Sequence, residues 1–185
     1  ALLTTRIFDP QHSNITGTHS IKTNLPDIYS MMGVCPQHDI LWESLNATDH
    51  LNFYGRLKGF NGSDLKEMVR AALKAVNLDS PRDRYKEVGS FSGGMKRRLS
   101  CAICLMGLPE VVFMDEPSTG LDPASRHALW NVISAAKGDK SIFLTTHSME
   151  EADVLSDRIA ITAAGEIPCV GNSASLKRRF GRGYT

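Results

Sequence analysis

The chain has 185 residues, of which 42% are hydrophobic and 22% are charged, and its formal net charge is +1. This length suits one domain with its own hydrophobic core, and the composition is that of an ordinary globular protein. The small net charge argues against bulk electrostatic binding to nucleic acid or to an anionic membrane surface, and no apolar run approaches the roughly 18 residues needed to span a bilayer.

The first part of the chain is predicted to contain helical pieces and one strand. Residues 1–8 are expected to be the end of a helix, stopped by the Asp-Pro dipeptide that follows, whereas residues 11–24 are polar and carry little pattern. Residues 25–32 are expected to form a helix, and residues 33–35 a short strand that leads to Gln37.

The region from Leu45 to Leu105 is expected to be mostly helical. Thr48 is a candidate N-cap for one helix, whose apolar residues recur three positions apart and which ends at Gly59. Ser63 is a candidate N-cap for the next helix, in which the apolar residues form a single stripe. Such stripes pack against a core, so the region is expected to be a small helical unit.

Buried strands alternate with helices in the rest of the chain. The apolar runs Val111–Met114 and Ser141–Thr145 are expected to be strands. A helix is expected to start between them at Asp122-Pro123, because aspartate is a good N-cap and proline suits the first helical position. The remaining elements are a hairpin around Gly165 and a basic helical tail, Ser175–Phe180. This alternation predicts a parallel α/β sheet, in which ligands bind beyond the carboxyl ends of the strands.

A Ser-Gly-Gly turn, made by Ser92, Gly93 and Gly94, opens another predicted helix. Free backbone N–H groups at a helix start suit an anion such as phosphate, although an ordinary N-cap is the alternative. The basic residues Lys96–Arg98 follow in the first turns, where each cation opposes the helix macrodipole by about 0.3–1 kcal/mol. An anionic ligand would relieve that cost, and a solvated basic face is the other reading.

Polar side chains follow the two predicted strands. Asp115 and Glu116 end the first, and two adjacent carboxylates there suit a hydrated Mg²⁺ and a polarised water. His147 follows the second, directly before a sequence that fits a capping box at Ser148, so it is expected on an exposed strand-to-helix turn. Gln37 is long enough to touch both a metal-bound water and a moving neighbour. Each residue alone could be structural, but with the Ser-Gly-Gly turn they predict nucleotide chemistry.

The four cysteines give no disulfide framework in a chain of this length. Cys101 and Cys104 form a CxxC pair, which invites a zinc or redox interpretation. They lie well inside the predicted helix and no second CxxC exists, so they are expected to be small buried packing residues.

Taken together and in their order, these segments resemble the ATP-binding cassette (ABC) proteins. FSGGM is similar to their signature motif, VVFMDE to Walker B and STGLD to the D-loop, while His147 matches the switch histidine and Gln37 the Q-loop glutamine. The resemblance spans roughly 150 residues and is greatest to the A subfamily, the plant members in particular. It implies a RecA-like P-loop NTPase core with a parallel sheet, residues 1–40 and 107–185, and an inserted helical signature subdomain, residues 41–106.

The resemblance also implies a mechanism. ATP would lie between two such domains arranged head to tail, with Asp115 holding Mg²⁺ through water and Gln37 sensing the metal and coupling to the membrane domain. Glu116 would position and polarise the attacking water, and His147 would steady the γ-phosphate. Ser92, Gly93 and Gly94 would meet the γ-phosphate of the partner's nucleotide, and Asp122 would reach across the interface. Met95 replaces the glutamine of the common LSGGQ signature and cannot hydrogen-bond a ribose.

The clearest departure from the family pattern is the absence of a Walker A sequence, GxxxxGK[ST]. In the family it lies just upstream of a segment similar to residues 1–8, and a strand-turn-strand follows, of which Thr16-Gly17-Thr18 is a candidate trace. The chain is therefore expected to be a fragment that lacks the N-terminal strands. Three functions remain open: the larger part of a transporter ATPase domain, a truncated product that hydrolyses no ATP and only offers its signature face, and an ABC ATPase unconnected to a membrane.

In the first of these, the implied partners are a second nucleotide-binding domain and the transmembrane domains of the same transporter, with no nucleic acid. The expected location is the cytoplasmic face of a membrane, and the A subfamily implies a lipid or amphipathic substrate.

Overall fold

The computed structural model describes residues 2–7, 22–138 and 140–180. The turn expected at Thr16-Gly17-Thr18 lies outside the described residues. Within those residues, no helix combines the length and apolar character that a membrane span requires.

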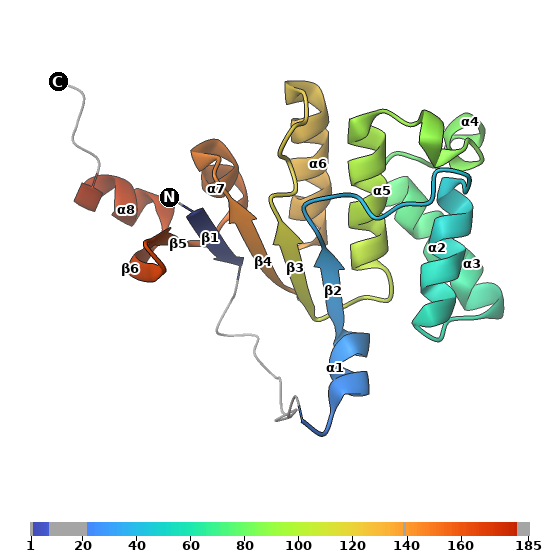
Figure 1. Ribbon diagram of the computed structural model, residues 1–185, viewed down its shortest axis with the longest axis horizontal. Coiled ribbons are helices and arrows are strands. Elements are labelled where there is room, and N and C mark those ends of the chain that lie inside the picture. The colour runs from blue at the N-terminus through green and yellow to red at the C-terminus, as the bar shows by residue number, and fades with distance from the viewer. Residues whose placement is uncertain (1, 8–21, 139, 181–185) are drawn as a thin grey trace.

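A six-stranded sheet in the order β2-β3-β4-β1-β5-β6 forms the centre of the molecule (Figure 1). Its first three strands, β2 (Met32–Cys35), β3 (Val111–Asp115) and β4 (Ser141–Thr146), are parallel, with Val112 paired to Gly33 on one side and to Ile142 on the other. The parallel sheet with its helices confirms the predicted α/β class.

The other half of the sheet is antiparallel. β1 (Leu2–Ile7) lies between β4 and β5 (Arg158–Ala163) and runs antiparallel to both, and β6 (Glu166–Gly171) closes the edge. The predicted hairpin is confirmed, and its turn residues Ala164 and Gly165 both have positive φ, as a tight hairpin turn requires.

The prediction of a helix end at residues 1–8 is wrong, because Leu2–Ile7 forms strand β1. This segment contains Thr4, Thr5 and Ile7, whose branched side chains favour extended backbone. The decisive factor is not local: β4 and β5 each present an edge, and the segment supplies hydrogen-bond partners to both.

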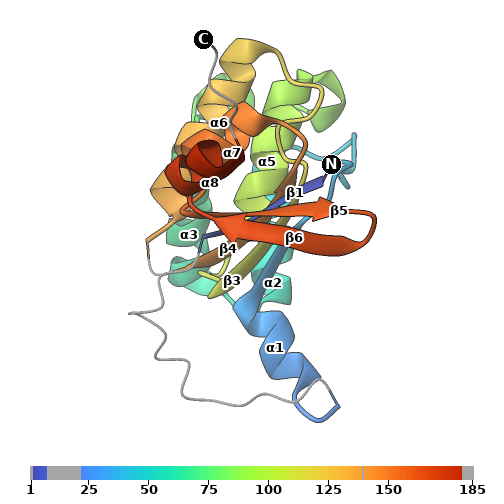
Figure 2. The same cartoon turned by 90° about the vertical axis from the view of Figure 1, so that its left-hand side faces the viewer.

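Three helices cover one face of the sheet, α5 (Gly93–Leu105), α6 (Pro123–Ala136) and α7 (Met149–Leu155), as Figures 1 and 2 show. Alternate strand residues point into the core beneath them, which also contains residues of α5, α6 and α7: Cys35, Cys101, Cys104, Val112, Met114, Leu129, Trp130, Ile133, Ile142, Leu144 and Leu155. The strand residues between them face the opposite way, where Val34 and Phe113 are exposed and Phe113 stacks on Phe143.

A second core lies between α5 and the preceding helices, at the right of Figure 1. Those helices are α2 (Ala47–Leu57), α3 (Gly62–Ala75), α4 (Pro81–Arg84) and the 3₁₀ turn Val88–Ser90. Leu99 and Ala102 of α5 belong to this core, whereas Cys101 and Cys104 belong to the core under the sheet. Helix α5 is therefore shared by both cores. The predicted domain boundaries at residues 40 and 107 stay a prediction.

The two expected N-caps in the helical region are wrong. Asn46 caps α2 by accepting a hydrogen bond from the Asp49 N–H, while the Thr48 hydroxyl donates to the carbonyl of Arg84. Helix α3 begins one residue before Ser63, and its N-cap is Asn61. Asn46 and Thr48, like Asn61 and Ser63, are short polar residues that all suit an N-cap, so the local sequence alone does not decide between them.

Two other helix starts lie where they were predicted. Asp122 caps α6 with Pro123 at its first position, and Ser148 caps α7 by accepting from the Glu151 N–H. The capping box is only half formed, because the Glu151 carboxylate is buried and accepts a hydrogen bond from Trp130 Nε1 at 2.9 Å. The remaining two predicted helices are confirmed as α1 (Leu25–Met31) and α8 (Ser173–Phe180).

Candidate functional site

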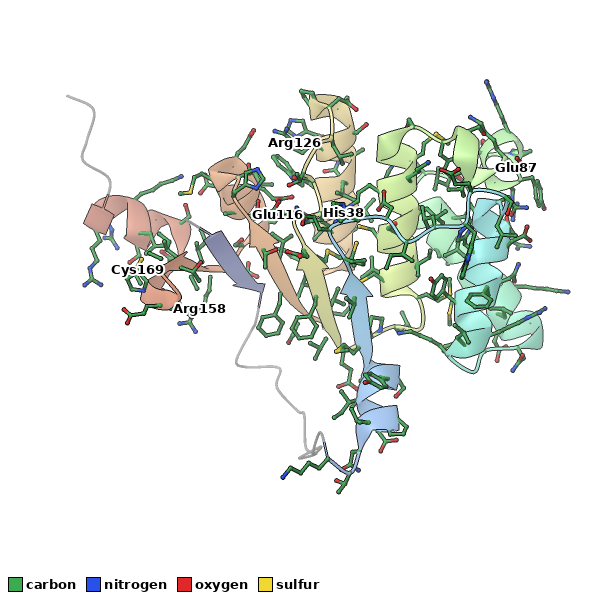
Figure 3. The ribbon with its side chains drawn as sticks, in the orientation of Figure 1. His38, Glu87, Glu116, Arg126, Arg158 and Cys169 are labelled. Carbon is green, nitrogen blue, oxygen red and sulfur yellow. The ribbon has the colours of Figure 1, made fainter. Side chains whose placement is uncertain are left out.

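Two predicted site residues, Gln37 and His147, meet one carboxylate oxygen of a third, Glu116, at the carboxyl ends of the parallel strands (Figure 3). Gln37 Nε2 donates a hydrogen bond to Glu116 Oε2 at 3.1 Å, and His147 Nδ1 lies 3.3 Å from the same oxygen. The Thr119 hydroxyl donates to it as well, at 3.0 Å. Gln37 follows β2, Glu116 follows β3 and His147 follows β4, so the parallel register of the sheet brings them together.

Glu116 and His147 differ in the exposure of their side chains. The side chain of Glu116 is 16% exposed, whereas that of His147 is 61% exposed on the turn between β4 and α7. A carboxylate held by two neutral donors beside an exposed imidazole can accept a proton from a small nucleophile.

The backbone at Glu116 is in the left-handed region, with φ of +41°. Its N–H donates both to the carbonyl and to the hydroxyl of Thr145, at 3.1 Å each. The Thr145 hydroxyl in turn donates to the Asp115 carboxylate. Thr145 therefore fixes the turn that separates the directions of the two neighbouring carboxylates, a role that a threonine inside an apolar run did not suggest.

Asp115 and Glu116 offer the carboxylate oxygens that Mg²⁺ prefers, and Gln37 adds an amide. Across the described ranges 2–7, 22–138 and 140–180, no three histidine, cysteine, aspartate or glutamate residues gather into a metal-binding group. Carboxylate and amide oxygens suit a hard cation that keeps several waters or takes oxygens from a phosphate, as Mg²⁺ does, whereas structural zinc prefers thiolate and imidazole ligands.

The Ser-Gly-Gly turn lies at the N-terminus of α5, beside the N-terminus of α6. Ser92 caps α5 by accepting from the Met95 N–H, and both Ser92 and Gly93 are exposed. Gly94 is buried against Ser125 of α6: a Cβ at Gly94 would lie 2.4 Å from the Ser125 hydroxyl oxygen. Asp122 is exposed at the start of α6, and hydrogen bonds from Ser125 lower the pKa of its carboxyl.

Two alternatives were expected for the basic residues after this turn, an anionic ligand or a solvated basic face, and Arg97 fits neither. Its side chain is only 4% exposed and donates to the carbonyls of Pro36, Asp115 and Pro117. A buried guanidinium was not expected here. The signal that could have indicated it is spacing, because Arg97 precedes Cys101 by four residues and Cys104 by seven and therefore shares their helix face.

The flanking cations are also bound to protein groups. Arg98 donates to the carbonyls of Val76 and Asn77 at 2.7 and 3.2 Å, and Lys96 pairs with Glu43 at 3.4 Å. The folded chain therefore needs no anionic ligand to give these cations partners.

The CxxC pair is buried, as predicted. Burial raises the pKa of the Cys104 thiol, and a hydrogen bond with Cys35 together with burial raises the pKa of Cys101. Such thiols are poor nucleophiles and poor metal ligands at neutral pH, which supports a packing role.

Comparison with known sequences gives a consistent match. The sequence profile described as ABC transporter matches residues 2–119. "ABC transporter A family member 4" of Arabidopsis thaliana is 56% identical over 161 residues, which is 87% of this chain and 17% of that protein. "ABC transporter A family member 12" of the same plant is 58% identical over 157 residues, 85% of this chain and 17% of that protein. The chain thus spans 17% of the length of each of these relatives.

Comparison with solved structures agrees on the fold. A chain titled "Structure of ATP binding subunit of ABC transporter" superposes with a TM-score of 0.74 at 24% sequence identity, covering 90% of this chain and 70% of that one.

Proposed function

Because the chain belongs to the ABC transporter family, we propose that it is the ATP-binding and ATP-hydrolysing part of an A-family transporter. The observation that carries the proposal is the convergence of Gln37, Thr119 and His147 on the Glu116 carboxylate at the ends of the parallel strands. Phosphoryl transfer needs placement and charge neutralisation more than covalent help, and such a cluster can supply both.

In this proposal Glu116 polarises the attacking water. Gln37 and Thr119 hold the carboxylate in one orientation, so that the water is aligned before the reaction begins. His147 is exposed beside the carboxylate and steadies the γ-phosphate. Asp115 would hold Mg²⁺, with Gln37 sensing the metal beside it, and the bound cation would supply neutralisation of the phosphate charge.

A second nucleotide-binding domain, arranged head to tail, is part of the proposal. Ser92 and Gly93 are exposed at the start of a 13-residue helix, and the N–H groups there suit the γ-phosphate on the partner's nucleotide. Asp122 is exposed at the neighbouring helix start and reaches across the interface. Gly94 is buried against Ser125, so we assign it to packing of the turn rather than to direct contact with phosphate.

The rest of the proposed transporter lies outside these residues. We propose transmembrane domains in the same polypeptide, a location at the cytoplasmic face of a membrane, and a lipid or amphipathic substrate. Residues 41–106 would form the helical subdomain, and residues 1–40 and 107–185 part of the core. The 185 residues contain no GxxxxGK[ST] sequence, so the proposed hydrolysis needs a phosphate-binding loop from outside them.

The test is Glu116→Gln in the intact polypeptide that carries this chain. ATP affinity is expected to stay within about threefold of wild type while turnover falls by at least about 100-fold, because the amide cannot accept a proton from water. Glu110→Gln is the matched control, because Glu110 is an exposed glutamate that directly precedes the first residue of β3, at the end of the strand away from Glu116. Hydrolysis at the wild-type rate in Glu116→Gln would remove Glu116 from the mechanism.

The alternative of a non-hydrolysing product that only offers its Ser-Gly-Gly turn is favoured by the absent Walker A sequence. We expect the 185-residue chain alone to have negligible ATP affinity, measured by calorimetry. Micromolar binding by the chain alone would show that the Walker A loop is dispensable. Stimulation of a second domain's hydrolysis by an inactive polypeptide would favour the alternative.

A further inference from the structure

Arg97 of α5 connects three backbone segments that meet at the candidate site. Its Nε donates to the Pro117 carbonyl at 2.7 Å, and its Nη2 donates to the Asp115 carbonyl at 3.0 Å. Its Nη1 donates to the Pro36 carbonyl at 2.5 Å and to the Asp39 carboxylate at 3.2 Å. Every nitrogen of this buried guanidinium therefore has a partner, as burial of a charge demands.

The carbonyls that accept from Arg97 are next in sequence to the residues of the site. Pro36 directly precedes Gln37, while Asp115 and Pro117 lie on either side of Glu116. The direction of a side chain is set by the peptide groups on either side of it, so one guanidinium fixes the directions of both Gln37 and Glu116. Glu116 also has a positive φ, a conformation that persists only where neighbouring groups hold it.

We propose that Arg97 is a positioning residue, which makes the geometry of Gln37 and Glu116 depend on how α5 is seated against the sheet. This rests on the proposed ATP hydrolysis. Arg97 lies about one helical turn after Gly93, and the same rigid helix presents the exposed turn at Ser92 and Gly93. When that turn contacts a partner's nucleotide, a shift of α5 would therefore change, through Arg97, the positions of Gln37 and Glu116 in the same domain.

The three acceptors require a guanidinium rather than a charge alone. Arg97→Lys keeps the positive charge but replaces a planar fork with one ammonium, which cannot serve three carbonyls on different segments. Arg98→Lys is the matched control, because Arg98 is the next residue and donates to the carbonyls of Val76 and Asn77, in the helical region. Both variants lose bonds from a guanidinium to backbone carbonyls, but only the first loses them at the site.

The first measurement is hydrogen exchange of backbone amides in the intact polypeptide, which needs no ATP. Arg97→Lys is expected to raise exchange by about tenfold or more in residues 37–40 and 115–119, because their carbonyl anchors are lost. Arg98→Lys is expected to raise it only near residues 76–78. Wild-type exchange in both site segments of Arg97→Lys would overturn the proposal.

The second measurement is ATP hydrolysis by the same proteins. Arg97→Lys is expected to lower kcat by about 10- to 100-fold with KM within about threefold, since misplaced groups cost rate more than binding. Arg98→Lys is expected to keep kcat within about threefold. Faster exchange with an unchanged kcat would overturn the positioning role. A wild-type protein without hydrolysis would refute the proposed function instead, and the exchange result would then decide the structural claim alone.

A milder variant covers the case in which Arg97→Lys fails to fold. Asp39→Asn weakens one bond of the guanidinium and leaves its three carbonyl partners. Exchange is expected to rise about two- to fivefold in residues 37–40 and to stay unchanged in residues 115–119. Equal changes in both segments, or none in either, would contradict the assignment of that bond.

Discussion

The two glycines of the Ser-Gly-Gly turn lie in different surroundings, and alanine substitution should separate their roles. Among the residues that the structure describes, a Cβ at Gly93 would have no heavy atom within 4 Å outside its own helix and chain neighbours. A Cβ at Gly94 would lie 2.4 Å from Ser125 Oγ and 2.8 Å from Ser125 Cβ. Both glycines are in helix α5, so alanine suits the backbone at each position.

The expected free energies of unfolding follow from these distances. In Gly94→Ala the Ser125 hydroxyl can rotate away, but its Cβ cannot, so the first turns of α5 and α6 must separate by several tenths of an ångström, at a cost of about 1–3 kcal/mol. Gly93→Ala meets no obstacle and restricts the unfolded chain, which stabilises the protein by up to about 1 kcal/mol. The two variants should therefore differ by about 2 kcal/mol or more.

Urea unfolding followed by tryptophan fluorescence measures this difference, since Trp130 is buried in the core under the sheet. In a Ser125→Gly background the obstructing Cβ is gone. Adding Gly94→Ala to that background should therefore cost much less free energy of unfolding than Gly94→Ala costs in the wild-type protein. Equal stabilities of the two alanine variants would refute the reasoning from packing.

Gly93→Ala then tests the functional part. In the intact polypeptide this variant should be folded and yet hydrolyse ATP at least about tenfold more slowly, because the added methyl group covers N–H groups proposed to meet the partner's phosphate. Hydrolysis equal to that of wild type would remove the exposed turn from the proposed nucleotide contact.

Two further predictions concern stability. Gly33→Ala should lower the free energy of unfolding by about 1–3 kcal/mol or more in the same urea assay. The reason is that its Cβ would lie 2.2 Å from the backbone oxygen of Cys104. Wild-type stability of this variant would contradict the close approach of β2 to α5. Hydrogen bonds from Lys177 and Ser173 hold the pKa of the Asp153 carboxyl below its usual value. A lowered folded-state pKa stabilises the protein above the usual pKa of about 3.9, and this contribution is lost as the pH falls through the folded value. Asp153→Asn should therefore speed amide exchange in α8 at pH 7 and reduce the acid-induced increase in exchange there; unchanged exchange at pH 7 would show that the ion pair does not hold α8.

The convergence at Glu116 followed from local patterns. Two apolar runs that end in Asp115-Glu116 and before His147 predict neighbouring parallel strands, and parallel strands place their carboxyl ends at one rim. The structure adds Thr119 and Thr145, whose hydroxyls hydrogen-bond to the carboxylates of this rim.

The features that were not predicted depend on groups distant in sequence. Arg97 is separated by 61 residues from one of its carbonyl partners and by 20 from another, so no local pattern identifies them. The local sequence of β1 does not by itself identify a strand, because its partners, β4 and β5, begin more than a hundred residues later. In both cases the partner that determines the structure is provided by the tertiary fold.

The sharing of α5 between two hydrophobic cores has a consequence for cooperativity. Leu99 and Ala102 are packed in the helical core, and Cys101 and Cys104 in the core under the sheet, so neither core can be dismantled while the other keeps this helix intact. We therefore expect both cores to unfold in a single thermal transition, with one calorimetric peak that contains the unfolding enthalpy of both.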